Sequence, residues 1–368
     1  MDSKQKKISV LMFPWLAYGH ISPFLELAKK LSKRNFHIFF CSTPINLNSK
    51  SKLSPKYSQS IQFVEFHLPS SPDLPPHYHT TNGLPPHLMN TLKKTLDMSS
   101  LHFSKILETL NPDLLVYDFI QPWAPLLALS NKIPAVHLLC TSAAMSSFSV
   151  HAFKKPCEDF PFPNICVHGN FMNAKFNNMM ENCSGDDGIS DQDRVLQSFE
   201  RSTKIILVKT FEELEGKFMD YLSVLLNKKI VPTGPLIQDP NEEGDDDERT
   251  KMLLEWLNKK SKSSTVFVSF GTIPMHLDQP FNARLVVDVG VGLEVRRNHK
   301  NGSLEREEIA KVIKEVVLGD YENGGEVVRR KAREMSNHIN KKGEKEMDEL
   351  VEELMHICEM KPNSCYLS

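Results

Sequence analysis

Short apolar runs recur along the first 236 residues, and helix-like stretches separate them. Each run is bounded by polar or turn-forming residues, which is typical of buried strands. Strands that are apolar throughout and alternate with helices predict a doubly wound α/β fold with a parallel sheet. The predicted strands are Ile8–Phe13, His37–Cys41, Ile61–Phe66, Leu114–Tyr117, Ala135–Leu139 and Ile205–Val208.

Apolar residues at helical spacing lie between these strands. We expect helices from about Pro23 to Lys33, from Leu88 to Leu110 and from Trp123 to Asn131. Ser22 can cap the first of them and Pro23 can take its first helical position. The pattern therefore places His20 in the loop between the first strand and the first helix.

Two long segments interrupt the alternation. One spans Pro69 to Pro86 and is rich in Pro and His, and the other spans Pro156 to Asp193 and is rich in Asn and Phe. Long ordered loops in compact domains usually line binding sites. The first insertion contains His77, His79 and His87, but an HxH spacing without a nearby carboxylate or Cys is a weak metal signal, and we expect no metal site there.

The character of the chain changes after residue 236. Residues 237–250 contain the acidic run Asn241–Glu248, which is typical of a solvated linker. Residues 1–236 are therefore predicted as the first domain and residues 251–368 as the second. The second domain is expected to contain a helix near Met252–Lys259, a strand Thr265–Phe270, a helix from about Pro280, a strand Gly292–Val295, and helical stretches from Leu304, Gly325 and Glu344.

Composition excludes several classes of protein. The formal net charge of the 368 residues is −2, which provides no clustered basic surface for nucleic acid. No window reaches the roughly 18 apolar residues of a membrane span. The seven cysteines are odd in number and widely spaced, and they form neither CxxC nor a Cys/His zinc pattern. We expect reduced thiols in a cytoplasmic monomer.

Two candidate catalytic residues follow strands at the same edge of the predicted sheet. His20 follows the first strand, and Asp118 directly follows Leu114–Tyr117. Ligands of open α/β sheets bind outside the carboxyl ends of the strands, so the imidazole is a candidate general base and the carboxylate its partner. Taken singly, His20 is as well explained as a polar loop residue and Asp118 as a helix cap. GxSxG, P-loop and GxGxxG motifs are absent, which disfavours hydrolase, NTPase and dinucleotide-binding readings.

The combination of motifs resembles the plant UDP-dependent glycosyltransferases, which have the two-domain GT-B fold built from Rossmann-like domains. His79–Pro86 and His276–Pro280 resemble the subgroup that adds a sugar onto the sugar of a flavonoid, terpenoid or apocarotenoid glycoside. The likeness spans nearly the whole chain. The stretches that carry it are Pro14–Pro23, Asp118 with Trp123, Val231–Leu236, Val266–Thr272 and Pro274–Ala283.

The resemblance implies roles for particular residues. His20 would deprotonate the acceptor hydroxyl with Asp118 as its partner, Thr272 would lie by the diphosphate, and Asp278 and Gln279 would hold the hydroxyls of the donor sugar. The amide of Gln279 at the terminal position of the pair, where an imidazole is the alternative, resembles the family members that use glucose. The chemistry needs no metal, no cofactor and no covalent intermediate, because UDP-glucose is a co-substrate and the reaction inverts the anomeric centre.

Acceptor recognition would involve aromatic side chains and the first insertion. We expect Trp15, Tyr18, Trp123 and the segment from Pro69 to Pro86 to line a cleft with apolar walls for a small hydrophobic glycoside. Each aromatic side chain can equally belong to the core.

The chain departs from the family pattern in its donor signature. In the family this signature runs from a Trp that stacks on uracil, through a His-Cys-Gly-Trp phosphate segment and a ribose-binding Glu, to a terminal Asp-Gln or Glu-Gln pair. Only that terminal pair is present. On the order of a hundred residues are absent between Thr272 and Ile273, so the C-terminal domain is truncated internally. Two hypotheses follow: an inverting glucosyltransferase, or a non-catalytic remnant that binds hydrophobic glycosides without transfer.

Overall fold

A computed structural model describes residues 7–48, 53–165, 189–237, 248–261, 278–298, 303–319 and 324–359. The chain divides into two compact units. Unit 1 comprises residues 1–158, 177–238 and 342–368, and unit 2 comprises residues 159–176 and 239–341. The catalytic candidates His20 and Asp118 both belong to unit 1.

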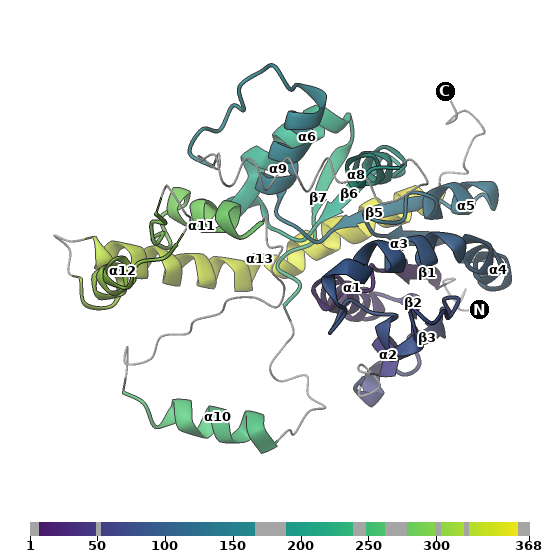
Figure 1. The fold of residues 1–368 in the computed structure, drawn as a ribbon, viewed down its shortest axis with the longest axis horizontal. Helices are drawn as coiled ribbons and strands as arrows, with labels where there is room; N and C mark the ends of the chain where they lie inside the picture. The colour runs from purple at the N-terminus through teal and green to yellow at the C-terminus, as the bar shows by residue number, and fades with distance from the viewer. Residues whose placement is uncertain are drawn as a thin grey trace, which may run out of the picture. The chain divides into compact units, whose positions relative to one another are not determined.

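Unit 1 is built on a seven-stranded parallel sheet with the strand order β3-β2-β1-β4-β5-β6-β7 (Figure 1). The six strands predicted from apolar runs are confirmed, and β7 is an addition to them. The order reverses at β1, which pairs with β2 on one side and β4 on the other. The strands are β1 (Ile8–Phe13), β2 (Phe36–Ser42), β3 (Ile61–Glu65), β4 (Leu114–Tyr117), β5 (Ala135–Leu139), β6 (Ile205–Val208) and β7 (Lys229–Pro232).

Helices cover both faces of this sheet. Met89–Met98 and Ser100–Leu110 replace the single helix expected from Leu88 to Leu110. The helices of unit 1 are α1 (Tyr18–Ser32), α2 (Pro44–Asn48), α3 (Met89–Met98), α4 (Ser100–Leu110), α5 (Ala124–Ser130), α6 (Ala143–Lys154), α8 (Asp191–Glu200) and α9 (Glu212–Leu226), with 3-10 turns η1 (Pro55–Tyr57), η2 (Pro76–Tyr78) and η3 (Pro86–Leu88).

Alternate side chains of each strand enter two different cores. Val10 and Met12 of β1 point into one core with α1, whereas Leu11 and Phe13 point into the other with α3, α4 and α5. All four side chains are fully buried. Because neighbouring residues of a strand point to opposite faces, a run that is apolar at every position requires cover on both sides.

The start of α1 differs from the prediction. The helix begins at Tyr18 with Ala17 as its N-cap, so Ser22 is not the cap and Pro23 lies inside the helix. The Ala17 carbonyl accepts the N–H groups of His20 and Ile21, each at 2.9 Å, and these bonds form the first turn. His20 therefore lies in the first turn of a helix rather than in a loop.

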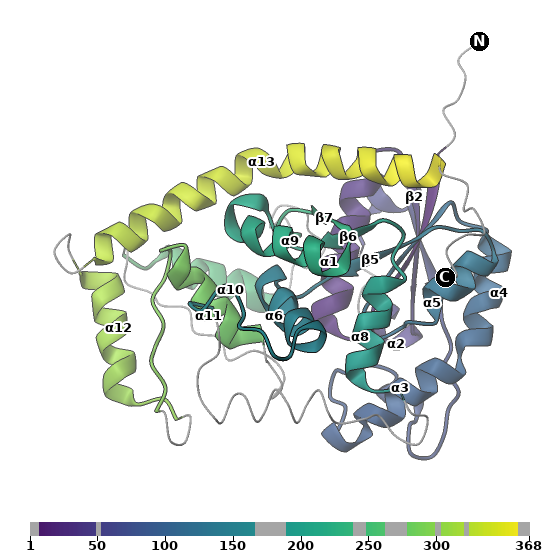
Figure 2. The same cartoon turned by 90° about the horizontal axis from the view of Figure 1, so that it is seen from above.

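The last helix, α13 (Gly325–Glu359), is continuous where two helical stretches were expected. Its last part belongs to unit 1, although the sequence placed residues 251–368 entirely in the second domain. Figure 2 shows its C-terminal turns on the side of α1 and β2. The packing follows from four buried apolar side chains that join the core of α1, namely Met347, Leu350, Leu354 and Ile357.

Unit 2 contains α10 (Glu248–Asn258), α11 (Asp278–Asp288), α12 (Arg306–Leu318) and the first part of α13. Residues Gly292–Val295 do not form the predicted strand. Gly290 has φ +75° and the N–H groups of Val291 and Gly292 return to the Val286 carbonyl, so this stretch is a helix C-cap instead. The predicted strand Thr265–Phe270 and most of the acidic linker lie outside the described residues.

None of the helices in the described part of the chain combines the length and hydrophobicity of a membrane-spanning segment.

Candidate active site

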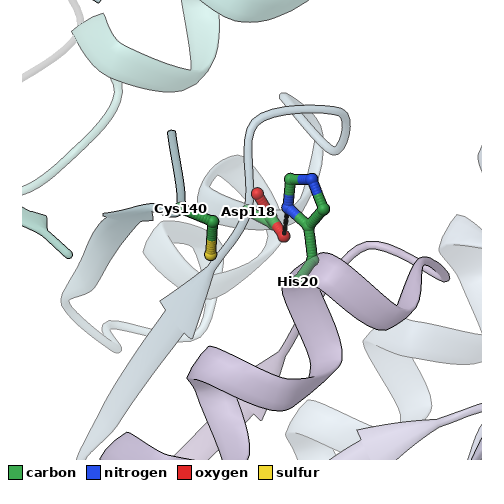
Figure 3. A group of neighbouring side chains, drawn as sticks. All are labelled: His20, Asp118 and Cys140. Atoms are coloured by element: carbon green, nitrogen blue, oxygen red, sulfur yellow. Dashed lines mark hydrogen bonds and ion pairs between the residues drawn. The ribbon is translucent and has the colours of Figure 1, made fainter. Parts of the chain in front are cut away.

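His20 and Asp118 meet at the carboxyl edge of the sheet, at the point where the strand order reverses. His20 lies in the first turn of α1, after the loop that follows β1, and Asp118 directly follows β4. The imidazole Nδ1 lies 2.8 Å from Asp118 Oδ2. Figure 3 shows the other ring nitrogen, Nε2, directed away from the carboxylate. The pairing predicted from two strand ends is therefore present in the fold.

The Asp118 carboxylate is fully buried, and N–H donors surround it. Its Oδ2 also accepts the backbone N–H of Trp15 at 2.9 Å, and its Oδ1 accepts the N–H of Phe119 at 2.8 Å. Burial alone would raise the pKa of Asp118, but the charge and hydrogen bond of His20 and the Trp15 N–H hold that pKa below its usual value. The carboxylate is therefore ionised and can only accept hydrogen bonds.

An ionised Asp118 determines the tautomer of His20. Because the carboxylate has no proton to give, Nδ1–H must donate to it, which leaves the lone pair on Nε2. The His20 ring is also stacked on Phe119, with 5.1 Å between the ring centroids. Its side chain retains 17% exposure, so Nε2 can meet a ligand proton. The pair has the geometry of a general base with an orienting carboxylate.

Two residues beside this pair were not identified from the sequence. Cys140 directly follows β5, and its sulfur lies within 4.8 Å of the ligating atoms of His20 and Asp118 (Figure 3). His137 lies within β5 and is fully buried, and neither of its ring nitrogens has a hydrogen-bond partner. The rule that located Asp118 at a strand end would also have located Cys140.

The environment of these two residues favours their neutral forms. Burial lowers the pKa of His137 to about 4, although the charge of Asp118 acts in the opposite direction. Burial raises the pKa of the Cys140 thiol well above its usual value, and the charge of Asp118 adds to that effect. His137 contacts the rings of Tyr117 and Phe199 edge to face, at 5.5 and 5.0 Å between centroids.

The three aromatic residues predicted to bind acceptor have different environments. The Trp15 side chain is only 5% exposed and belongs to the core, whereas Tyr18 is 63% exposed at the start of α1. Trp123 packs on Phe13 and donates its Nε1–H to Asp97 at 2.8 Å. Trp15 therefore belongs to the core, Trp123 is partly buried against it, and Tyr18 is the most exposed of the three; a role of Trp123 in acceptor binding stays a prediction.

The first insertion is hydrogen-bonded to the segments that follow β1 and β2. The N–H of Thr81 donates to the Leu16 carbonyl at 2.8 Å, and Thr43 donates to the His79 carbonyl at 2.7 Å. His79 is buried, and its Nε2 lies 3.2 Å from the Leu74 carbonyl. One of these bonds is to Leu16, the neighbour in sequence of Trp15, and the Trp15 N–H donates to Asp118. The insertion therefore lies near the catalytic candidates. Most of the second insertion lies outside the described residues.

The residues predicted to bind the donor belong to unit 2. Asp278 and Gln279 begin α11, and Gln279 is exposed. Thr272 lies outside the described residues. Unit 2 also contains a cleft of about 550 Å³, which Val287, Leu293 and Val312 line together with three cationic and four acidic side chains, Arg296, Arg297, Lys311, Glu294, Glu305, Glu308 and Glu315.

Comparison with known proteins identifies relatives over the whole chain. Residues 6–238 match the family model for the glycosyltransferase N-terminal domain. UDP-glucosyltransferase 29 of Panax ginseng is 42% identical over an alignment that covers 98% of this chain and 99% of that protein. Beta-D-glucosyl crocetin beta-1,6-glucosyltransferase of Gardenia jasminoides is 36% identical, with coverage of 94% and 98%.

The fold comparison agrees with the sequence comparison. A UDP-glucosyltransferase of Polygonum tinctorium, solved in complex with 3,4-dichloroaniline, superposes with a TM-score of 0.71 at 18% identity, covering 97% of this chain and 99% of that one. The alignment with the ginseng protein spans 454 positions, which exceeds the 368 residues of this chain by 86. At least that many positions of the relative therefore have no counterpart here.

Proposed function

The chain belongs to the plant UDP-dependent glycosyltransferases of the GT-B fold, and on this premise we propose that it transfers glucose from UDP-glucose to a hydroxyl on the sugar of a small plant glycoside, with inversion. The observation that carries the proposal is the 2.8 Å contact between His20 Nδ1 and Asp118 at the carboxyl edge of the sheet. It leaves Nε2 as the base for an acceptor hydroxyl.

In the proposed reaction, His20 Nε2 takes the proton of the acceptor hydroxyl as that oxygen attacks the anomeric carbon of the sugar. The bond to UDP breaks on the opposite face, so an α-linked donor gives a β-glycoside and UDP. Asp118 stabilises the imidazolium that forms, because its carboxylate is ionised and within hydrogen-bond distance. No metal, cofactor or covalent intermediate takes part in this scheme.

Acceptor binding is proposed at the edge of unit 1 beside the dyad. Tyr18 is the exposed aromatic residue nearest in sequence to His20, and the insertion from Pro69 to Pro86 is fastened at Leu16. The glucosyl crocetin enzyme of Gardenia jasminoides is named for extending a glucoside, which supports a glycoside as the acceptor class. Donor sugar contacts are proposed for Asp278 and Gln279, with Thr272 at the diphosphate. We further propose that the protein acts in the cytoplasm as a monomer.

A second candidate function is a remnant that binds hydrophobic glycosides without transfer. The absence of at least 86 aligned positions favours it, since unit 2 then lacks much of what a donor site needs. The two candidates share the acceptor site and differ in turnover.

The test is a turnover assay with UDP-glucose and a panel of glycosides, read by mass spectrometry of the products. Replacing His20 with Ala should lower transfer by about 10²- to 10⁴-fold while leaving the fold intact, because the side chain supplies the base and lies in the first turn of α1. The melting temperature should fall somewhat, because the buried Asp118 carboxylate loses one donor. His356, an exposed histidine on α13, provides the matched control His356→Ala. Transfer at the parental rate by a folded His20→Ala protein refutes the assignment, and a chain that binds glycosides but forms no product supports the remnant.

A further inference from the structure

Three side chains with metal-ligating atoms converge at the carboxyl edge of the sheet. His20 comes from α1, Asp118 from the end of β4 and Cys140 from the end of β5 (Figure 3). One nitrogen, one oxygen and one sulfur atom all lie within 4.8 Å of one another. Asp118 is fully buried, and the other two residues are half-buried.

We propose that His20, Asp118 and Cys140 form a binding site for Zn²⁺ that blocks the catalytic base. The bound ion is an inhibitor in this proposal and takes no part in the transfer. Imidazole nitrogen, carboxylate oxygen and thiolate sulfur are the ligand types that zinc prefers, and a set of three leaves the fourth tetrahedral position to water.

The distances fit a tetrahedral ion after small side-chain movements. Zinc bonds of roughly 2.0 Å to nitrogen and oxygen and about 2.3 Å to sulfur place neighbouring ligand atoms about 3.3–3.6 Å apart. The present Nδ1 to Oδ2 distance is 2.8 Å, so the ion would separate His20 from Asp118 slightly. The sulfur, now at most 4.8 Å away, would move inward.

Each proton that zinc binding displaces from His20 or Cys140 can be accounted for. Zinc coordination at Nδ1 requires the tautomer that carries its proton on Nε2, so the single proton of neutral His20 moves from one nitrogen to the other through solvent. Cys140 binds as the thiolate and releases its proton to solvent. Asp118 is already a carboxylate and keeps its charge. Burial and the charge of Asp118 oppose deprotonation of Cys140 and the charge of Lys209 favours it, so the bond to zinc must supply the remaining free energy.

The consequence for catalysis rests on the proposed function. A neutral imidazole with zinc on Nδ1 carries a proton on Nε2, and that nitrogen can no longer accept the proton of an acceptor hydroxyl. Zinc should therefore inhibit by removing the base, without competing for the nucleotide. Metal binding itself does not depend on whether the chain transfers glucose.

The experiment is a titration of the tag-free, reduced chain with Co²⁺ and then with Zn²⁺, in the absence of UDP-glucose and acceptor. Cobalt reports a thiolate ligand through a charge-transfer absorption band, and zinc affinity follows from calorimetry. We expect one equivalent to bind, with the band present in the parent and absent in Cys140→Ser and Cys140→Ala. Zinc affinity should fall about tenfold or more in these variants and in His20→Ala.

Cys157 is an exposed free thiol and provides the matched control. Cys157→Ser should keep the cobalt band and the zinc affinity. Equal zinc affinity in the parent and in a folded Cys140→Ser protein overturns the proposal, as does a band that disappears only with Cys157. If the chain transfers glucose, zinc inhibition should be lost in Cys140→Ser. A chain that binds zinc at this site but transfers nothing refutes the proposed function and leaves the metal site standing.

Discussion

At the scale of single residues, the Asp118 carboxylate provides the sharpest test of the dyad. It accepts hydrogen bonds from the His20 ring and from the N–H groups of Trp15 and Phe119. In Asp118→Asn the amide has one oxygen and one NH₂ group, so at least one buried donor loses its acceptor, at a cost of about 1–3 kcal/mol. We expect transfer to fall by about 10²- to 10⁴-fold, since His20 also loses its enforced tautomer.

Melting temperature and steady-state kinetics check this prediction together. Asp113→Asn is the matched control, because Asp113 accepts the N–H and hydroxyl of Ser9 at the opposite end of the strands. It should lose stability while keeping its transfer rate. If both variants lose activity in proportion to stability, Asp118 is a structural residue only.

His137 provides a prediction about pH. Its pKa is about 4 in the folded chain against an ordinary value of 6.5, so the unfolded chain binds the proton first as the pH falls. Stability is therefore fully present above about pH 6.5 and is lost progressively down to about pH 4, by about 3 kcal/mol in total. His137→Leu should remove this loss, because leucine carries no titratable group. The substitution should be tolerated, because neither ring nitrogen of His137 has a hydrogen-bond partner to lose.

Urea unfolding of the two proteins at a series of pH values measures the difference. The window distinguishes His137 from Asp118, whose lowered pKa makes its contribution disappear only at more acidic pH. An unchanged pH profile in His137→Leu would show that another group titrates in this range.

At the scale of elements, the last turns of α13 pack on unit 1 and should stabilise it. Leu350 is fully buried against the core that contains β1, β2 and α1. Arg34, which follows α1, donates to Asp348 and to Glu344 of α13, at 2.7 Å in each case. The exposed ion pairs add little, so the apolar contacts should contribute most of the free energy with which α13 packs on unit 1.

We predict that Leu350→Ala lowers the free energy of unfolding by about 2–5 kcal/mol, because the substitution leaves a cavity in a closed core. Glu352→Ala, on an exposed position of the same helix, should change it little. Chemical denaturation followed by circular dichroism provides both values. Equal effects of the two substitutions would mean that α13 does not pack on unit 1 in solution.

At the scale of the whole molecule, we expect the absent positions to limit donor binding. Nucleotide affinity in this architecture should come from stacking on uracil and from contacts to ribose and diphosphate. The cleft of unit 2 is lined by neither Asp278 nor Gln279 and presents more carboxylates than cations, so it offers no substitute site for a diphosphate. The helix α10 also exposes Met252, Leu253 and Trp256 at 66%, 55% and 49%.

We therefore predict that the 368-residue chain binds UDP weakly or not at all and transfers glucose far more slowly than a chain with the absent positions restored, in which the His20 and Asp118 variants are best compared. Calorimetric titration with UDP measures this directly. A chimera that restores the absent positions from the ginseng relative between Thr272 and Ile273 should recover UDP binding and reduce aggregation. Micromolar UDP binding by the unmodified chain would contradict the prediction.

Several features of the fold could be predicted from the sequence because their signals are local. Apolar runs identified six strands, and a parallel sheet places the ends of β1 and β4 at one edge. That geometry brings His20 near Asp118, and the pairing of β1 with β4 and the start of α1 complete the contact. The family resemblance and the internal truncation could also be read from motifs and from their absence.

Other features depended on contacts between segments far apart in the sequence. Ser22 and Pro23 predicted a helix start near residue 23, but α1 begins at Tyr18. The segment just before this start is hydrogen-bonded to the distant insertion, through the Thr81 N–H and the Leu16 carbonyl. The packing of Trp123 on the core depends on Phe13 and Asp97. The packing of the last turns of α13 on unit 1 depends on the core that contains β1, β2 and α1. Cys140 joins His20 and Asp118 only because β5 lies next to β4. Local patterns determine which segments are strands, but burial and convergence are properties of the packed chain.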